Sequence, residues 1–476
     1  MLLGLAGSVL LTLTASRLAD RRFHWWFRVV ISPEGLETAL FYVGSVALVG
    51  AWLGLGRIAR VDRCRPWPIA AAGFLWSLPL LVGAPLFSHD LFSYLAQGTI
   101  AHLGLSPYHY PPTVLAQHGY QHVLAGVDPF WRRATAPYGP LFVGVASLIV
   151  GVTGSHVFAG AIAIRLFNLC GLVVLALFAP RLARRLGSDP TRATWLAVSS
   201  PLILLQLVAP AHNDLLMAGL MVAGVWLALE GRPLLGIVIC MIAATIKLPA
   251  VAAALFIAVV WCRASESPLE AIATAAKALA AAVATAAVVT LVTGFGVGWI
   301  STSLFSTPAR VRLAITPATD ISFTIQKLLR DVGASVTFAD VESIVRALLF
   351  AASGIAALLF LARARWRTLV QCLGLTLVVF AFGGPALWPW YLAWALVLLA
   401  TWEPAQRSWI LVVGIVLASY VVRADGILLL SRGSSPIIAA FWVLAAVFGW
   451  LGWRRRRARR AYSEGLSGVG SALAQQ

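Results

Sequence analysis

Apolar segments of roughly 15–25 residues repeat along almost the whole chain, separated by turns rich in arginine, proline and glycine. Inside a lipid bilayer, backbone N–H and C=O groups must be hydrogen-bonded within the segment itself, so such segments are typical of membrane-spanning helices. We count about fourteen of them. The pattern therefore predicts an all-α fold, a polytopic transmembrane helical bundle.

One long polar interruption breaks this pattern directly after an early apolar segment. Residues 88–140 hold acids, histidines, arginines and many aromatic residues, and such side chains at a water–lipid boundary can reach a substrate with a polar head and a lipid tail. Within it, residues 90–103 alternate leucines with polar residues, which predicts an interfacial helix. The short apolar stretch 141–152 is predicted to be a second interfacial helix. If the polar loop is external and the next basic turn cytoplasmic, only one segment between them can cross the membrane, and that segment is 156–180.

These patterns divide the chain into four parts. They are N-terminal transmembrane helices at residues 1–87, an external catalytic loop with juxtamembrane helices at 88–155, a transmembrane bundle at 156–453 with an external loop at 294–340, and a basic tail at 454–476.

The composition excludes a soluble protein. Hydrophobic residues make up 60% of the chain and charged residues 11%, and the mean hydropathy is +0.87, so a soluble fold would expose large apolar patches. The net charge of +18 is carried mainly by arginines between apolar segments. Such arginines indicate that the loops that carry them are retained on the cytoplasmic side and contact membrane lipids. They do not indicate a nucleic-acid partner. This assignment predicts a multi-pass plasma-membrane protein with both termini cytoplasmic. It places residues 88–140 on the external face.

Asp90 is the first candidate for chemistry. It begins the external loop beside His89 and Tyr94, where a carboxylate can take a proton from a sugar hydroxyl. The alternative is a helix N-cap, because Ser-His-Asp before an apolar-periodic run is a common helix start. The two roles are compatible.

A second acid, Asp214, lies between two apolar segments with almost no loop. His212, Asn213 and Asp214 are therefore expected at the external ends of adjacent helices, where they would support the site. Acids at a membrane boundary are costly to hold and are functional by default. A solvated turn with a capping Asn or Asp is the alternative.

Four cations are candidates for binding a phosphate. Lys247 interrupts a long apolar run, and Arg165 lies a few turns inside a span. Arg310 and Arg312 lie in the long external loop at 294–340, and a guanidinium is a planar fork matched to phosphate oxygens. The alternatives are snorkelling of Lys247 to the interface and lipid headgroup contacts for Arg310.

Aromatic side chains in the external loops can stack on sugar rings, and Tyr108 and Tyr138 are predicted to do so. A late cluster that includes Trp388, Trp390 and Trp394 is instead attributed to an interfacial aromatic belt. The sequence has no CxxC or HExxH pattern, so it specifies no metal site. No cofactor is assigned, and participation of a divalent cation stays open.

Six short motifs together resemble a known family. They are HDLFSYLAQG, GLSPY, DPFWRRATAPYGPL, AHNDLLMAGLMVAG, AATIKLPA and LWPWYLAW. They are similar to those of the actinobacterial polyprenol-phosphate-mannose-dependent α-1,6-mannopyranosyltransferases of the GT-C superfamily. The resemblance implies that Asp90 is the catalytic acid of the first loop and Asp214 the second acidic position. Many superfamily members carry two acids together in the first loop, whereas here His89 precedes a single Asp90.

The resemblance also implies a reaction. Mannose would move from polyprenyl-phosphate-mannose to an oligomannoside or lipoglycan acceptor, with inversion, and Asp90 would act as the base. Two alternatives stay open from the residues alone. One is a GT-C transferase for another polyprenyl-linked sugar, and the other is a transporter or flippase of lipid-linked sugars.

Overall fold

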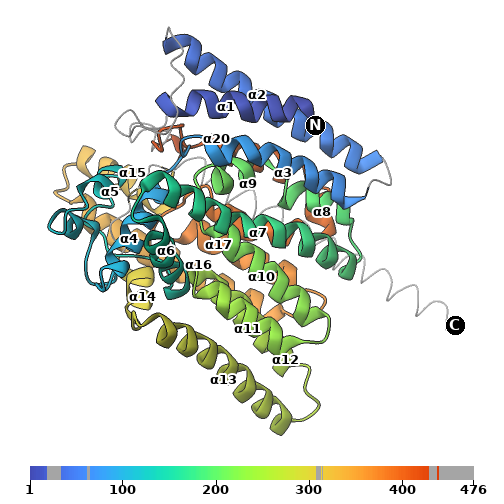
Figure 1. Ribbon diagram of the computed structural model, residues 1–476. Helices are drawn as coiled ribbons and strands as arrows, with labels where there is room; N and C mark the ends of the chain where they lie inside the picture. The colour runs from blue at the N-terminus through green and yellow to red at the C-terminus, as the bar shows by residue number, and fades with distance from the viewer. Residues whose placement is uncertain (19–33, 62–64, 307–311, 313–314, 428–436, 439–476) are drawn as a thin grey trace.

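The structure is a computed structural model that describes residues 1–18, 34–61, 65–306, 312, 315–427 and 437–438. In these ranges every element of secondary structure is a helix (Figure 1). The predicted all-α fold is therefore confirmed.

The first half of the chain contains α1 (Leu2–Leu18), α2 (Glu34–Val61), α3 (Pro66–Val82), α4 (Asp90–His102), η1 (Pro112–Ala116), α5 (Gln121–Gly126), α6 (Pro140–Thr153), α7 (Val157–Arg185), α8 (Pro190–Ala197), α9 (Pro201–Ile203), η2 (Leu204–Val208) and α10 (Asp214–Leu229). The second half contains α11 (Pro233–Ala244), η3 (Leu248–Ala250), α12 (Val251–Cys262), α13 (Pro268–Thr293), α14 (Gly298–Ser301), η4 (Thr302–Ser306), α15 (Pro317–Asp331), α16 (Phe338–Arg363), α17 (Leu369–Gly383), α18 (Tyr391–Leu399), α19 (Glu403–Gln406) and α20 (Trp409–Tyr420).

Within the described ranges, five helical stretches are long and apolar enough to cross a membrane. They are Gly35–Arg60, Val157–Arg185, Pro190–Val208, Pro268–Thr293 and Phe338–Arg363, and eight shorter apolar helices accompany them. The outer helices α13 and α16 leave most of their apolar side chains uncovered by protein, as lipid-facing helices do. The chain is thus a membrane protein, while the count of about fourteen spans stays a prediction.

Glycines bring the helices that carry the site close together. A Cβ atom on Gly171 of α7 would lie 2.3 Å from the carbonyl oxygen of Leu215, and one on Gly219 of α10 would lie 2.6 Å from that of Gly171. Close backbone approach at small residues is common between membrane helices. It fixes the start of α10, and so Asp214, against α7.

The predicted helix at 90–103 is present as α4, but it is not half exposed. Residues Leu91 to Ala101 are all buried, including the polar side chains of Gln97 and Thr99. The helix packs against α6, α7, η1 and α5, which cover it on several sides. The second predicted interfacial helix is present as α6, and the depth of both helices in the membrane stays a prediction.

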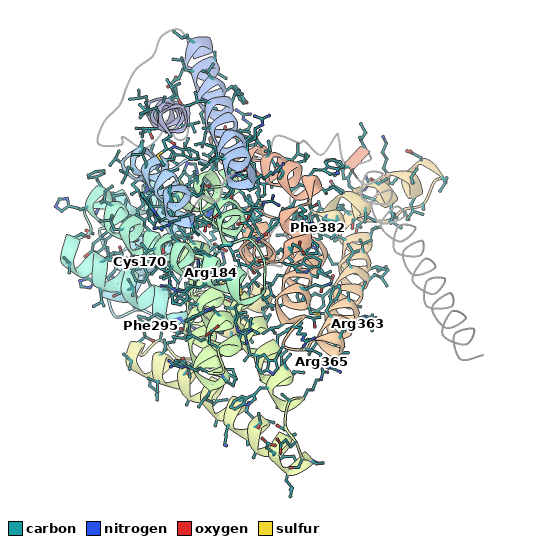
Figure 2. All side chains as sticks on the ribbon, turned by 90° about the vertical axis from the view of Figure 1, so that its right-hand side faces the viewer. Cys170, Arg184, Phe295, Arg363, Arg365 and Phe382 are labelled. Atoms are coloured by element: carbon teal, nitrogen blue, oxygen red, sulfur yellow. The ribbon has the colours of Figure 1, made fainter. Side chains whose placement is uncertain are left out.

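The helices have two distinct ends. The short helices α4, α5, α14 and α15 gather at one end of the bundle (Figure 1). Figure 2 shows Arg363 and Arg365, at the junction of α16 and α17, well away from Phe382, which lies near the other end of α17. Likewise, Arg65 before α3 and Arg184 near the end of α7 share one groove. Arg65 and Arg184 thus lie at the ends of α3 and α7 opposite to those that border the loop at 88–155.

Candidate active site

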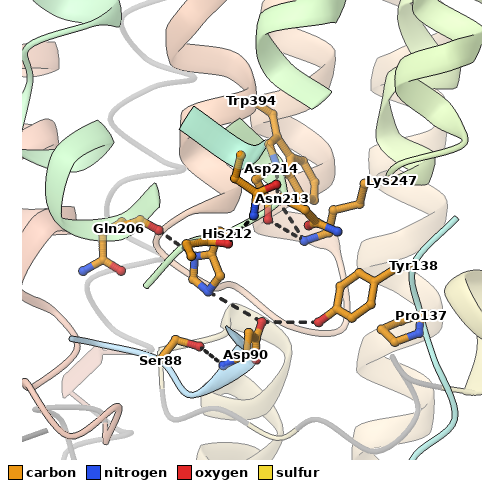
Figure 3. A network of polar contacts seen from close by, with 12 residues as sticks. Ser88, Asp90, Pro137, Tyr138, Gln206, His212, Asn213, Asp214, Lys247 and Trp394 are labelled. Atoms are coloured by element: carbon orange, nitrogen blue, oxygen red, sulfur yellow. Dashed lines mark hydrogen bonds and ion pairs between the residues drawn. The ribbon is translucent and has the colours of Figure 1, made fainter. Parts of the chain in front are cut away.

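Asp90 is the first residue of α4, and its carboxylate faces two other segments of the chain (Figure 3). The Tyr138 hydroxyl donates to Asp90 Oδ2 over 3.4 Å, and His212 Nε2 lies 3.5 Å from the same oxygen. The backbone N–H of Asp90 donates to Ser88 Oγ. The Asp90 side chain is only 13% exposed, so it is held in place but still open to a ligand. The N-cap position of α4 is His89, whose side chain makes no capping hydrogen bond, so the N-cap role considered as an alternative for Asp90 is wrong. The carboxylate is therefore available for chemistry.

His212 comes from the turn between η2 and α10 and is completely buried. Its Nδ1 lies 2.6 Å from the carbonyl oxygen of Gln206, and its ring packs against Trp390 with centroids 4.1 Å apart. Burial lowers the pKa of His212 from its ordinary value of 6.5, although Asp90 and Asp214 act in the opposite direction. The turn at 212 is therefore part of the protein interior, so the solvated turn considered as an alternative is wrong.

Two non-glycine residues with left-handed backbone lie beside these side chains. Phe87 has φ of 68° shortly before Asp90, and Ala211 has φ of 63° directly before His212. Such a conformation costs about 1–2 kcal/mol for a residue with a Cβ atom. Strain of this kind is retained where the surrounding packing fixes a functional geometry.

Asp214 and Lys247 form a buried ion pair next to this group. Lys247 Nζ lies 2.9 Å from Asp214 Oδ1 and 2.7 Å from Oδ2, and Trp394 Nε1 donates to Oδ1 over 2.6 Å. The ammonium lies over the rings of Tyr391, Tyr138 and Trp394 at 5.3, 5.8 and 5.8 Å. Lys247 therefore does not snorkel to the interface, and its charge is balanced by Asp214.

Tyr138 connects the ion pair with Asp90, because its hydroxyl bonds Asp90 while its ring lies over Lys247. The next residue fixes the loop: Gly139 N–H donates to Ile246 O over 2.9 Å, and a Cβ atom on Gly139 would lie 2.1 Å from Thr245 O. Only glycine allows this contact with the end of α11. Burial and the nearby Asp90 raise the pKa of Tyr138, so its hydroxyl keeps its proton.

The other predicted aromatic residues lie behind Tyr138. The Tyr108 hydroxyl donates to the Tyr138 carbonyl oxygen over 3.0 Å. Tyr94 packs edge-on against the Tyr138 ring at 4.9 Å, and its hydroxyl accepts the backbone N–H of Asn213. Both tyrosines thus position the loop and the turn, and neither is among the residues that line the cavity described next.

A cavity of about 350 Å³ opens beside Asp90. It is lined by Phe87, Ser88, His89, Asp90, Asp128, Phe130, Trp131, Arg312, Trp388, Trp390 and Gly426. The structure therefore brings Arg312, from the segment between η4 and α15, into the same cavity as Asp90. Arg312 is held by Glu342, whose Oε2 lies 2.7 Å from its Nε. Arg310 lies outside the described residues.

Several residues of the cavity are absent from the predicted site. Asp128 lies 3.9 Å from His89 Nδ1, and its signal in the sequence is a second acid in the same loop, in the motif DPFW. Trp388 and Trp390 line the cavity and stack on each other at 4.6 Å, although the sequence attributed them to an aromatic belt. Glu342 gives no local signal, because it reaches the site only through Arg312.

Arg165 does not reach the cavity. Its guanidinium is 1% exposed and donates to the carbonyl oxygens of Leu81 and Gly83 at 2.6 Å and of Ala209 at 3.0 Å. These bonds join the end of α3 to the turn that carries His212. The geometry gives Arg165 a scaffolding role, in place of the predicted contact with a phosphate.

No group of three or more His, Cys, Asp or Glu side chains in the part of the chain that the structure describes is arranged to hold a metal ion. The participation of a divalent cation, which the sequence leaves open, stays open.

Comparison with known proteins gives two family models that match most of the chain. Residues 1–263 match the N-terminal domain model of the alpha-(1->6)-mannopyranosyltransferases, and residues 321–455 match the MptB C-terminal domain model. The chain is 33% identical to alpha-(1->6)-mannopyranosyltransferase A of Mycobacterium tuberculosis over 85% of this chain and 80% of that protein. It is 31% identical to a probable alpha-(1->6)-mannopyranosyltransferase of Mycolicibacterium smegmatis, over 89% of this chain and 83% of the relative. No solved structure gave a significant match.

Proposed function

Because this chain belongs to the alpha-(1->6)-mannopyranosyltransferase family and is therefore a glycosyltransferase, we propose that it transfers mannose from polyprenyl-phosphate-mannose to an oligomannoside or lipoglycan acceptor. The proposed linkage is α-1,6, formed with inversion at the anomeric carbon. The observation that carries the proposal is the position of Asp90, on the wall of an aromatic-lined cavity that also contains Arg312.

The proposed reaction is a single displacement. Asp90 takes the proton of the acceptor hydroxyl while the hydroxyl oxygen uses a lone pair to form the new bond to the anomeric carbon of mannose. The bond from that carbon to the phosphate oxygen breaks, and its electron pair leaves with the polyprenyl phosphate. A phosphate is a good leaving group, so no acid has to protonate it. Attack from the opposite face turns a β-linked donor into an α-linked product.

Arg312 is the cation best placed to meet the phosphate. It lines the cavity with Asp90, and its side chain is 44% exposed, so the guanidinium is open to a ligand. Lys247 is less suited, because it is already bonded to both oxygens of Asp214. In this proposal Arg312 stabilises the charge that grows on the leaving phosphate, while Lys247 and Asp214 hold the site together.

The aromatic rings of the cavity suit a sugar ligand. Trp388 and Trp390 from the late turn and Phe130 and Trp131 from the first loop present rings on its walls. Apolar faces of sugar rings stack on such surfaces, while sugar hydroxyls need the polar groups between them. The proposed occupants are the donor mannose and the terminal sugar of the acceptor.

The proposed orientation places this cavity on the external face of the plasma membrane and both termini in the cytoplasm. Its support is the distribution of charge. Arg65 and Arg184 share a groove at the ends of α3 and α7 opposite to those that border the loop carrying Asp90. Basic loops are retained in the cytoplasm.

A reconstituted assay tests the proposal. Purified protein in liposomes is incubated with polyprenyl-phosphate-[¹⁴C]mannose and a short oligomannoside, and the product is analysed by NMR. We expect an oligomannoside extended by one α-1,6-linked mannose. Movement of the donor across the bilayer without product indicates a carrier, and product only from another polyprenyl-linked sugar indicates a different transferase. Either result contradicts the proposal.

A further inference from the structure

The two ring nitrogens of His212 face different partners. Nδ1 lies 2.6 Å from the carbonyl oxygen of Gln206. A carbonyl oxygen has no proton to give, so Nδ1 carries the N–H and donates it. In the neutral ring, Nε2 then has a lone pair, and this lone pair faces Asp90.

Nε2 and Asp90 Oδ2 are 3.5 Å apart, longer than the usual range of about 2.7–3.2 Å for an N–H···O bond. With Asp90 ionised and His212 neutral, both atoms are hydrogen-bond acceptors, so they cannot form a hydrogen bond with each other. The His212 side chain is 0% exposed, and among the described residues Nε2 has no hydrogen-bond partner. A buried acceptor without a donor is costly. Asp90 Oδ2 already accepts from the Tyr138 hydroxyl, so a proton that arrives on Asp90 would give Nε2 the donor it lacks.

We propose that His212 accepts, at Nε2, the proton that Asp90 removes from the acceptor hydroxyl, and so returns Asp90 to its carboxylate form. This inference rests on the transfer reaction proposed above. The proton passes from the hydroxyl oxygen to Asp90 Oδ2 and then to Nε2, which leaves an imidazolium beside a carboxylate. Because His212 is buried, the imidazolium returns the proton to Asp90 Oδ2 when the product leaves, and Asp90, which is partly exposed, passes it to water. His212 acts through Asp90 and is a positioning residue for the base.

The surroundings of His212 suit this role. The charged groups that face it are Asp90 from the start of α4, Asp214 from the start of α10 and Lys247 from the end of α11. Because Lys247 is paired with Asp214, the partner of opposite charge for an imidazolium is Asp90. Burial keeps the ring neutral before turnover, and the nearby carboxylates stabilise the imidazolium once a proton arrives.

Two substitutions test the inference. His212→Asn retains an N–H donor toward Gln206 O but has no Nε2 atom, and His212→Gln retains polarity but cannot hold a second proton. We expect kcat to fall about 100-fold in both, with KM for donor and acceptor unchanged. The acidic limb of the kcat profile should also move to lower pH, because a lone carboxylate holds a proton less tightly than the Asp90–His212 pair. His118→Asn, an exposed histidine in the same loop, is the matched control and should change neither quantity.

Folded variants with the kcat and the acidic limb of the wild type would overturn the inference. If neither variant folds, the wild-type profile decides. An acidic limb between the ordinary values of Asp, about 3.9, and His, about 6.5, supports a shared proton, whereas a limb at about 3.9 or below overturns it. A wild-type protein that forms no mannosyl product contradicts the proposed function itself and removes the basis of this inference. That result can be told apart from a failure of this inference alone, in which the wild type is active and substitution of His212 changes neither kcat nor the acidic limb.

Discussion

Lys247 Nζ contacts both carboxylate oxygens of Asp214, at 2.9 and 2.7 Å, inside the protein. Asp214 is 0% exposed and the Lys247 side chain 12%, so the Asp214 charge cannot be solvated if Lys247 is lost. Tyr138 lies over this pair and also bonds Asp90. The integrity of the ion pair thus determines the position of the group that carries the proposed chemistry.

Removing one partner of this pair should be more damaging than removing both. Lys247→Met leaves Asp214 as an uncompensated buried charge, and we expect a loss of about 3–5 kcal/mol in the free energy of unfolding. The double variant Asp214→Asn/Lys247→Met should be more stable than Lys247→Met alone. Thermal unfolding in detergent measures both. Lys327→Met, at an exposed lysine, is the control, and a double variant as unstable as the single one would argue against the pair.

The glycine next to Tyr138 should be irreplaceable. In Gly139→Ala the new Cβ atom would lie 2.1 Å from Thr245 O, so the loop must move and Tyr138 shifts relative to Asp90. A shift of about 1 Å can cost about 100-fold in turnover. Gly54→Ala, where nothing lies within 4 Å of the new atom, should keep full activity. Initial rates of the two variants decide, and equal rates would show that the loop does not depend on this contact.

Arg165 should matter for stability more than for donor binding. Arg165→Met removes the donors to three buried carbonyl oxygens, and we expect a loss of about 3 kcal/mol or more. Arg165→Lys should recover only part of it, because a single ammonium cannot replace a planar fork. The KM for the donor should stay within about twofold for the folded protein. A large rise in this KM at unchanged stability would instead indicate a phosphate contact.

The lowered pKa of His212 makes a prediction about stability and pH. The unfolded chain takes up a proton at this histidine as the pH falls through about 6.5, whereas the folded protein does so only at lower pH. The unfolded state therefore binds more protons in that window, and stability falls as the pH decreases. Going from about pH 7.5 to about pH 5.5 should lower the Tm of the wild type more than that of His212→Asn. Equal decreases would indicate that the histidine is not buried in neutral form.

The sequence predicts the helical fold, and it predicts that the polar segments around Asp90 and Asp214 lie close together. Both predictions follow from hydrophobic periodicity. Asp90 follows one apolar segment and Asp214 separates two others, so the pattern alone predicts both acids at one membrane boundary. The partners of the cations were not predictable in this way. Lys247 meets Asp214 and Arg165 meets three carbonyl oxygens through the packing of remote helix ends, which no local pattern encodes.

The tryptophans of the late turn show a different limit. Trp388 and Trp390 line the cavity, yet tryptophan is enriched at membrane interfaces whether or not a ligand is present. Composition therefore cannot separate a sugar-stacking residue from a lipid anchor. The contacts of Trp390 with His212 and of Trp394 with Asp214 connect this cluster with the site.

The most direct test of the account replaces the proposed base. Asp90→Asn keeps the size and much of the polarity of the side chain but cannot take a proton, while Asp331→Asn alters an exposed acid that does not line the cavity. Incorporation of [¹⁴C]mannose into an oligomannoside is measured for both variants and the wild type, with donor binding and thermal unfolding measured in parallel. The account predicts that Asp90→Asn folds and binds the donor but loses transfer by about 100-fold or more, while Asp331→Asn is fully active. Transfer by a folded Asp90→Asn protein at close to the wild-type rate would contradict it.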